Sequence, residues 1–261
     1  MRHVTTVASR ELRSLFVSPV AYGVMSLFAV LAGFFFLLSV GWFNTRLIQL
    51  QQFQMVEEMQ QLNLNDHLLT FFYGDMTTLL LFLVPGITMG LFAAEKANGT
   101  QELLMTSPLT IWDIVLGKFL AGGLFVAALV GIAALYPVLL FVYGDPELGR
   151  SLTGLLGVML VGWVYVAIGA FASSLTKSQV VAILISFVLM IVILLLPAVA
   201  GLGMVDAAPW VGEFFRYASS MTHFENLVKG VVDTSDLAYF AAVIAIFALM
   251  SKAAVESARW R

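Results

Sequence analysis

The sequence has 261 residues, of which 61% are apolar and only 11% are charged. An ordinary soluble domain carries about 25% charged residues, and the mean hydropathy of this chain is +0.96. Such a composition excludes a disordered chain. The net charge of −3 and the absence of cysteine exclude a basic DNA-binding protein, a disulfide scaffold and a thiolate metal site. The chain is therefore predicted to be an integral membrane protein.

The first segment, residues 1–19, carries apolar side chains at helical spacing, with Arg10 and Arg13 on the opposite face and Pro19 at its end. This pattern predicts an amphipathic helix that lies in the membrane interface. A structural anchor and a contact for a cytoplasmic partner are both compatible with it. The apolar stretch that follows is too long for the core of a cleaved signal peptide.

Long uncharged stretches separate the charged residues in the rest of the chain. About 20 apolar residues cross the ~30 Å hydrocarbon core of a bilayer, and five stretches are long enough. The stretch between Asp236 and Lys252 is shorter, but the lysine side chain can extend to the headgroups. We therefore predict an all-α membrane protein with six transmembrane helices, at residues 20–43, 76–94, 111–143, 151–175, 179–203 and 236–253.

Six spans place both termini on the same side of the membrane. Nine of the 13 basic residues lie on that side, and they are Arg2, Arg10, Arg13, Lys96, Lys118, Lys177, Lys252, Arg259 and Arg261. Because basic residues are enriched on the cytoplasmic side, both termini are expected to be cytoplasmic. A five-span arrangement would move the three C-terminal basic residues outside, which makes it less favourable.

Two longer segments are expected on the extracytoplasmic side. Residues 44–74 are rich in Gln, Leu and Met and are expected to form a partly helical cap. Residues 204–235 are acidic and aromatic, which suits a re-entrant or interfacial pair of helices. Within this segment, His223 and Glu225 are interpreted as stabilising the loop rather than binding a metal ion.

No predicted span contains an ionisable side chain at its centre, which argues against a proton- or ion-coupled carrier. The HExxH pattern of zinc proteases is absent, and Gly117-Lys118 lacks the remaining residues of a P-loop. We therefore predict no catalytic residue and no ATP hydrolysis by this chain. Energy for any work must come from elsewhere.

Segment 95–110, between the second and third spans, contains a series of helix stops and starts. Gly99 is a good helix terminator, Thr100 can cap a short helix over residues 101–105, and Pro108 stops it. Thr110 and Asp113 form a capping box that begins the third span. A short helix across the ends of two spans would act as a rigid lever, whereas a plain helical connection would not need these signals.

Several motifs in this order resemble a known family. They are E-K-x-N-G-T-Q-E-L-L-M-T-S-P-L-T from Glu95 followed by V-L-G-K-F-L-A, F-A-S-S-L-T-K-S-Q from Phe171, S-S-M-T-H-F-E-N from Ser219 with G-V-V-D-T, and R-E-L-R-S-L-F-x-S-P from Arg10. In them the chain resembles the permeases of ABC-2-type transporters, and it is most similar to the gliding-motility-associated branch. The resemblance covers essentially the whole chain.

The resemblance implies a single transmembrane domain over residues 1–261 with the ABC-2-type exporter fold. It implies the bacterial cytoplasmic (inner) membrane and a permease subunit that exports a substrate or does work on the envelope, powered by a separate cytoplasmic ABC ATPase. ATP and Mg²⁺ would bind that ATPase, with no cofactor, metal or nucleic acid on this chain. A second copy or a sister permease would complete the unit, with a possible periplasmic auxiliary subunit. The alternative is a non-transporting membrane scaffold of a gliding or envelope complex.

The resemblance also implies which residues couple the permease to its ATPase. The segment 95–110 would hold the coupling helix, residues 1–19 would form a connector helix, and the fourth-to-fifth connection would add a smaller contact. The implied coupling residues are Arg10, Arg13, Glu95, Lys96, Gly99, Thr100, Glu102, Leu103, Leu104, Ser107, Pro108, Thr176 and Lys177.

Overall fold

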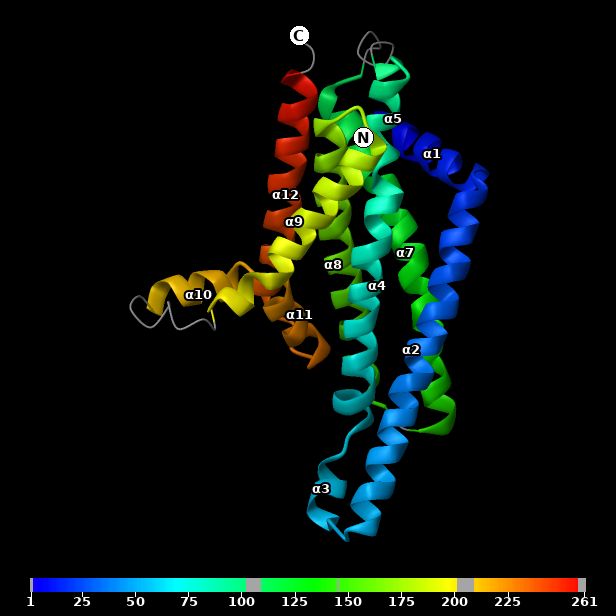
Figure 1. The fold of residues 1–261 in the computed structure, drawn as a ribbon, viewed down its shortest axis with the longest axis vertical. Coiled ribbons are helices and arrows are strands. Elements are labelled where there is room, and N and C mark those ends of the chain that lie inside the picture. The colour runs from blue at the N-terminus through cyan, green and yellow to red at the C-terminus, as the bar shows by residue number, and fades with distance from the viewer. Residues whose placement is uncertain (1, 102–108, 145, 201–208, 258–261) are drawn as a thin grey trace.

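The computed structural model describes residues 2–101, 109–144, 146–200 and 209–257, which form an elongated helical bundle (Figure 1). Within these ranges no residue lies in a β-strand. Six helical segments are long and apolar enough to cross a membrane, and they are Pro19–Gln52, Asn65–Ala97, Ile111–Val142, Leu148–Leu175, Gln179–Leu196 and Thr234–Ser257. The predicted all-α membrane fold with six spans is confirmed.

The helices follow one another with short connections. In chain order they are α1 (Arg2–Val17), α2 (Pro19–Gln52), α3 (Val56–Gln61), the π-helix η1 (Asn65–Leu69), α4 (Thr70–Thr88), α5 (Gly90–Ala97), α7 (Ile111–Tyr143), α8 (Leu148–Leu175), α9 (Gln179–Ala200), α10 (Pro209–Tyr217), α11 (Ser220–Val228) and α12 (Thr234–Ser257). Helix α1 and the ends of α5 and α12 lie at one end of the bundle, which we call the terminal end (Figure 1). Helix α3 lies at the opposite, distal end.

A sharp corner separates α1 from α2, so that α1 runs across the bundle while α2 follows its long axis (Figure 1). Ser18 makes this corner because its side chain accepts a hydrogen bond from the backbone N–H of Val20 at 3.3 Å. Pro19 occupies the first turn of α2, where no hydrogen-bonded N–H is needed. The predicted helix over residues 1–19 thus corresponds to α1.

Helix α2 has 34 residues. At 1.5 Å per residue it is about 51 Å long, more than the ~30 Å of a hydrocarbon core. Its final turns and α3 therefore project beyond the other helices at the distal end, where the sequence predicted a partly helical cap (Figure 1). In the predicted re-entrant segment, α10 projects sideways and α11 returns to the bundle, and residues 201–208 lie outside the described ranges.

Helix α8 is the centre of the bundle, and it packs against α4, α5, α7, α9, α11 and α12. Its glycines allow these neighbours to approach closely. A Cβ atom at Gly169 would lie only 2.0 Å from Oγ1 of Thr88 on α4, and one at Gly154 would lie 2.4 Å from the Tyr73 ring. Small residues are favoured at such contacts because close packing is a main source of helix association in a membrane.

The close contact at Gly169 predicts that Gly169→Ala destabilises the bundle. The new methyl group meets the side chain of Thr88, which is itself fully buried, and we expect a loss of about 1–3 kcal/mol in the free energy of unfolding. Thermal unfolding of the purified protein in detergent measures this. The control is Gly131→Ala on α7, where nothing lies within 4 Å of the new Cβ atom, and its expected change is below about 0.5 kcal/mol. Equal effects would contradict the packing argument.

Candidate functional site

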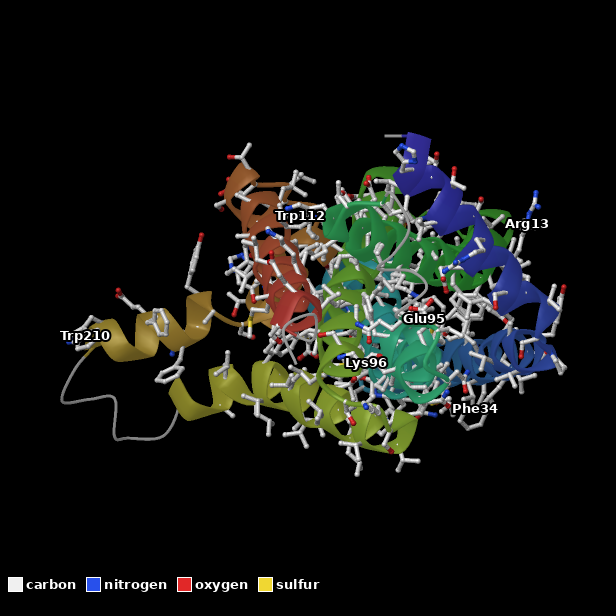
Figure 2. The ribbon with its side chains drawn as sticks, turned by 90° about the horizontal axis from the view of Figure 1, so that it is seen from above. Arg13, Phe34, Glu95, Lys96, Trp112 and Trp210 are labelled. Carbon is white, nitrogen blue, oxygen red and sulfur yellow. The ribbon has the colours of Figure 1, made fainter. Side chains whose placement is uncertain are left out.

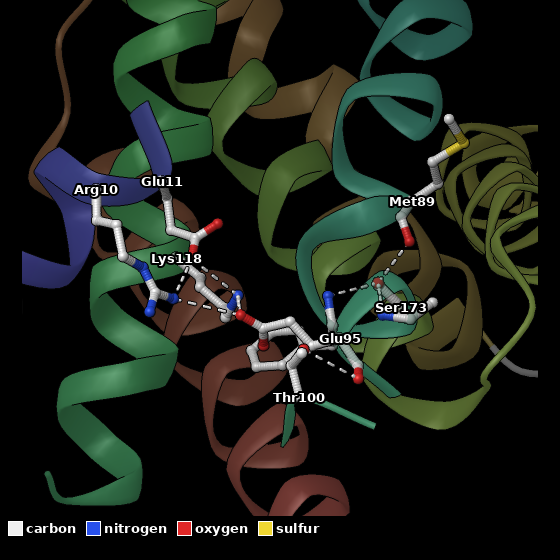
Figure 3. Close-up of polar contacts among 9 residues, drawn as sticks. Arg10, Glu11, Met89, Glu95, Thr100, Lys118 and Ser173 are labelled. Atoms are coloured by element: carbon white, nitrogen blue, oxygen red, sulfur yellow. Dashed lines mark hydrogen bonds and ion pairs between the residues drawn. The ribbon is translucent and has the colours of Figure 1, made fainter. Parts of the chain in front are cut away.

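Four charged side chains from three helices meet at the terminal end (Figure 3). The ammonium group of Lys118 on α7 lies 3.2 Å from Glu11 on α1 and 2.9 Å from Glu95 on α5. Arg10 contacts the same two carboxylates, at 2.6 Å and 3.3 Å respectively. We call these residues the terminal charge cluster. Its two positive and two negative charges balance, and it joins α1, α5 and α7.

Lys118 is the most buried member of the cluster, with a relative exposure of 0%. Its ammonium group also lies 5.2 Å from the centre of the Phe92 ring. A buried charge is strongly unfavourable unless it is paired, so the position of Lys118 depends on both carboxylates. On the exposed side, the hydrogen bond from Arg10 to Glu11 and the two negative charges raise the pKa of Arg10.

Backbone packing adds to the charged contact between α1 and α7. Gly117 precedes Lys118, and a Cβ atom at this position would lie 2.6 Å from Cβ of Val7 on α1. Helix α1 therefore rests directly on the backbone of α7. The glycine brings the two helices together, and the adjacent lysine supplies the charge that holds Glu11.

Hydrogen bonds from side chains fix α5 to the end of α8. They replace backbone hydrogen bonds that are missing where α4 ends and α5 begins. The Ser173 hydroxyl accepts hydrogen bonds from the backbone N–H groups of Phe92 and Ala93, each at 3.0 Å. It also donates to the carbonyl of Met89 at 2.7 Å, where α4 gives way to α5 (Figure 3). Lys96 donates to the carbonyl of Ser174. These bonds satisfy backbone groups at the α4–α5 break and hold α5 in place.

The predicted helix stop after Glu95 is confirmed. Helix α5 ends at Ala97, and Gly99 adopts a left-handed conformation with φ of 71°. The N–H of Thr100 then donates to the carbonyl of Glu95 at 3.0 Å, which is the main bond of a Schellman motif. Gly99 and Thr100 thus cap the helix that carries the Glu95 carboxylate.

The predicted start of the third span is also confirmed. The Thr110 hydroxyl accepts a hydrogen bond from the N–H of Asp113 at 3.2 Å, and the N–H of Thr110 donates to the Asp113 carboxylate at 3.1 Å. This reciprocal capping box begins α7. Capped helix ends therefore border residues 102–108.

Five predicted coupling residues lie outside the described residues, and they are Glu102, Leu103, Leu104, Ser107 and Pro108. The predicted short helix over residues 101–105 falls there too, apart from its first residue. The other predicted residues lie at the terminal end. The structure brings Arg10, which is 85 residues away in the sequence, into direct contact with Glu95.

The remaining predicted coupling residues lie around the terminal charge cluster rather than within it. Arg13 is exposed on α1 and lies at the outer rim, away from Glu95 (Figure 2). Thr176 accepts a hydrogen bond from the N–H of Ser178 at 3.0 Å just before α9. Lys177 is exposed, and its charge repels that of Lys96. Two lysines therefore lie near each other on this side of the terminal end.

Three residues that hold this site together were missed by the sequence analysis: Glu11, Lys118 and Ser173. Lys118 was counted only among the cytoplasmic charges, although a lysine about two turns inside an apolar helix is a signal for a buried ion pair. Glu11 carries no such signal because its neighbours in the sequence, Arg10 and Arg13, are charged. Ser173 lies in the motif from Phe171, and the motif does not indicate that its hydroxyl bonds the backbone of α5.

A second buried polar cluster lies where α11 meets the start of α12. The Nδ1 atom of His223 is 2.6 Å from the carboxylate of Asp236, and both side chains are almost fully buried. Asn226 donates to the same carboxylate at 3.3 Å. Among the residues that the structure describes, no three His, Asp or Glu side chains are arranged to bind a metal ion.

The six apolar helices define a multi-pass membrane protein. Residues 5–255 match the family model described as ABC-2 family transporter protein, so the chain belongs to this family. It is therefore a permease component of a membrane transporter, and the family implies a partner ATP-binding component. No curated protein matches the chain.

The pairing of Lys118 predicts that Lys118→Met destabilises the protein by about 3 kcal/mol, because two partly buried carboxylates then lose their main cation. Chemical denaturation in detergent measures the change. The control is Lys229→Met, which removes an exposed lysine 3.8 Å from Glu225, and its expected cost is below about 1 kcal/mol. A small effect at both positions would mean that Lys118 does not hold α1 and α5.

Proposed function

We propose that this chain is the membrane-spanning permease subunit of an ABC transporter that exports a substrate, or does mechanical work on the envelope, powered by a separate cytoplasmic ATPase. Membership of the ABC-2 family supports the permease role. The terminal charge cluster is the observation that supports coupling between this permease and the ATPase. It joins α1, α5 and α7 beside the connection that would receive the force.

The terminal end faces the cytoplasm in this proposal, and the membrane is the bacterial inner membrane. The distribution of basic residues supports this orientation, with nine of 13 on the side of the termini. Lys177 is exposed there, and Arg13 is exposed on the nearby α1. These groups are suited to an acidic protein surface.

The way in which the α5–α7 connection is anchored would couple the ATPase to the membrane helices. The ATPase would bind the segment 95–110, with Leu103 and Leu104 as its apolar contacts, and α1 and Lys177 beside it. Helix α5 is bonded to α8 through Ser173, and α7 is bonded to α1 through Lys118. A displacement of the connection is therefore passed to the membrane helices. ATP and Mg²⁺ would bind the ATPase, and the helices of this chain would transmit the movement.

A complete transporter needs a second permease, either another copy of this chain or a sister subunit. The motif similarity to the gliding-motility-associated branch supports membership of that branch and a periplasmic auxiliary subunit. The path would run between the two permeases, with α10 and α11 near the exit. They lie part-way along the bundle axis, away from α5, which supports this assignment (Figure 1).

Affinity purification from the native membrane in mild detergent tests the ATPase partner. We expect the wild type to retain a soluble ABC ATPase and the double variant Leu103→Asp plus Leu104→Asp to lose it, because charges would replace the apolar contact. The matched control is Val231→Asp plus Val232→Asp, two adjacent exposed apolar residues far from the terminal end, which should retain the ATPase. If the first variant keeps the ATPase, the docking site is wrong. If no ATPase is found with the wild type, the permease proposal fails.

A non-transporting scaffold is the second candidate, and the similarity to the gliding-motility-associated branch favours it. The two functions differ in how the partner ATPase responds to solutes. In reconstituted vesicles, an exporter should show ATP hydrolysis that rises several-fold with its substrate and falls when Lys118→Met breaks the terminal charge cluster. A scaffold should show hydrolysis that no solute changes.

A further inference from the structure

His223 lies at the meeting point of α10, α11 and α12, and only 3% of its surface is exposed. Both of its ring nitrogens have close partners. Nδ1 is 2.6 Å from the Asp236 carboxylate on α12, and Nε2 is 2.9 Å from the backbone carbonyl of Tyr217 on α10. One side chain on α11 therefore contacts both neighbouring helices.

These partners decide which nitrogens carry hydrogen. A backbone carbonyl only accepts hydrogen bonds, so Nε2 must donate to Tyr217. An ionised carboxylate also only accepts, so Nδ1 must donate to Asp236. A neutral imidazole has one N–H and cannot do both, whereas the doubly protonated imidazolium can.

The surroundings of Asp236 supply hydrogen-bond donors and a helix dipole to its carboxylate. The amide nitrogen of Asn226, which only donates, lies 3.4 Å and 3.3 Å from the two carboxylate oxygens. Asp236 is also in the first turn of α12, where the helix dipole stabilises a negative charge. A protonated carboxyl that donated to Nδ1 would give up part of this stabilisation.

The aromatic rings around His223 also suit a cation. The Tyr239 ring stacks on the imidazole with centroids 4.0 Å apart and an interplanar angle of 20°, and the Tyr217 ring meets it edge-on at 4.9 Å. A cation over an aromatic face is stabilised by the ring quadrupole.

The other charged groups of the packed helices are paired elsewhere or exposed. In the described residues, α9 has no ionisable side chain, and Arg150 of α8 pairs with Asp66 and Glu147. Glu225 of α11 is exposed and lies 3.8 Å from Lys229. Glu213 and Arg216 of α10 are also exposed. The ionisable groups that face His223 are thus Asp236 and the two tyrosines.

We propose that His223 is a buried proton-binding site that holds the α10–α11 pair to α12. With the proton bound, the imidazolium bridges the Asp236 carboxylate and the Tyr217 carbonyl. When the proton leaves, one of the two bonds is lost and Asp236 remains as a buried carboxylate without its cation. The helix pair is therefore held more tightly at low pH and is loosened as the pH rises. The proposal that this site senses the pH outside the cytoplasm rests on the proposed function. The protonation of His223 does not depend on that function.

Nitrogen NMR of protein labelled with ¹⁵N-histidine tests the protonation directly. The chain has only three histidines, and His223→Gln identifies the signals. At about pH 6 we expect both His223 nitrogens to carry hydrogen. An unprotonated nitrogen on His223 at about pH 6 would overturn the proposal. This measurement uses the wild type, so it holds even if a variant does not fold, and it does not depend on an ATPase partner.

Hydrogen exchange tests the link between the proton and the helix pair. After correction for intrinsic rates, exchange of the α11 amides in the wild type should rise at least about tenfold between about pH 6 and about pH 9. Asp236→Asn should raise the exchange rate of the α11 amides about a hundredfold at pH 6 and should remove most of its pH dependence. Glu225→Gln, which breaks an exposed pair on the same helix, should change it by less than about fivefold. A wild-type profile without pH dependence would refute the link.

Discussion

Close packing around α8 is the constraint on which the rest of the structure depends. Inside a bilayer, lipid tails are as apolar as leucine, so apolar side chains alone give little reason for helices to associate. Glycines on α8 solve this problem by allowing contact with the neighbouring helices. Gly154 and Gly169 meet α4, Gly162 meets α7, and Gly157 meets Phe224 of α11. The central helix thus fixes where its neighbours lie, and the polar sites form between helices that it positions.

Polar bonds at the two ends of α8 complement this packing. Towards the distal end, the Tyr73 hydroxyl on α4 donates to the carbonyl of Ser151 at 3.0 Å. At the terminal end, Ser173 bonds the backbone at the α4–α5 break. Between them the contacts are largely apolar, which suits a hydrocarbon environment where an unpaired polar group is costly. The α4–α8 pair is therefore a rigid frame that is tied at both ends.

The sequence predicted the parts of this structure that depend on local patterns. Uncharged stretches locate the six spans because hydrocarbon excludes charge, and Gly99 and Thr110 mark helix ends because their backbone and side-chain chemistry act within a few residues. The paired charges could not be predicted in the same way. Lys118 depends on Glu11, which is 107 residues away, and His223 depends on Asp236 in another helix. Only the packing of the helices reveals that such residues neutralise each other.

The anchoring of the α5–α7 connection explains why a permease would retain a buried lysine. A connection between two loosely held helices would absorb a push by local bending. Here α5 is bonded to the α4–α8 frame by Ser173, and α7 is joined to α1 by Lys118 and by the close contact at Gly117. Lys118 also pairs with Glu95 across the base of the connection, so α5 and α7 cannot separate there without breaking an ion pair of the buried ammonium group. That cost makes joint movement of α1, α5 and α7 more favourable than their separation.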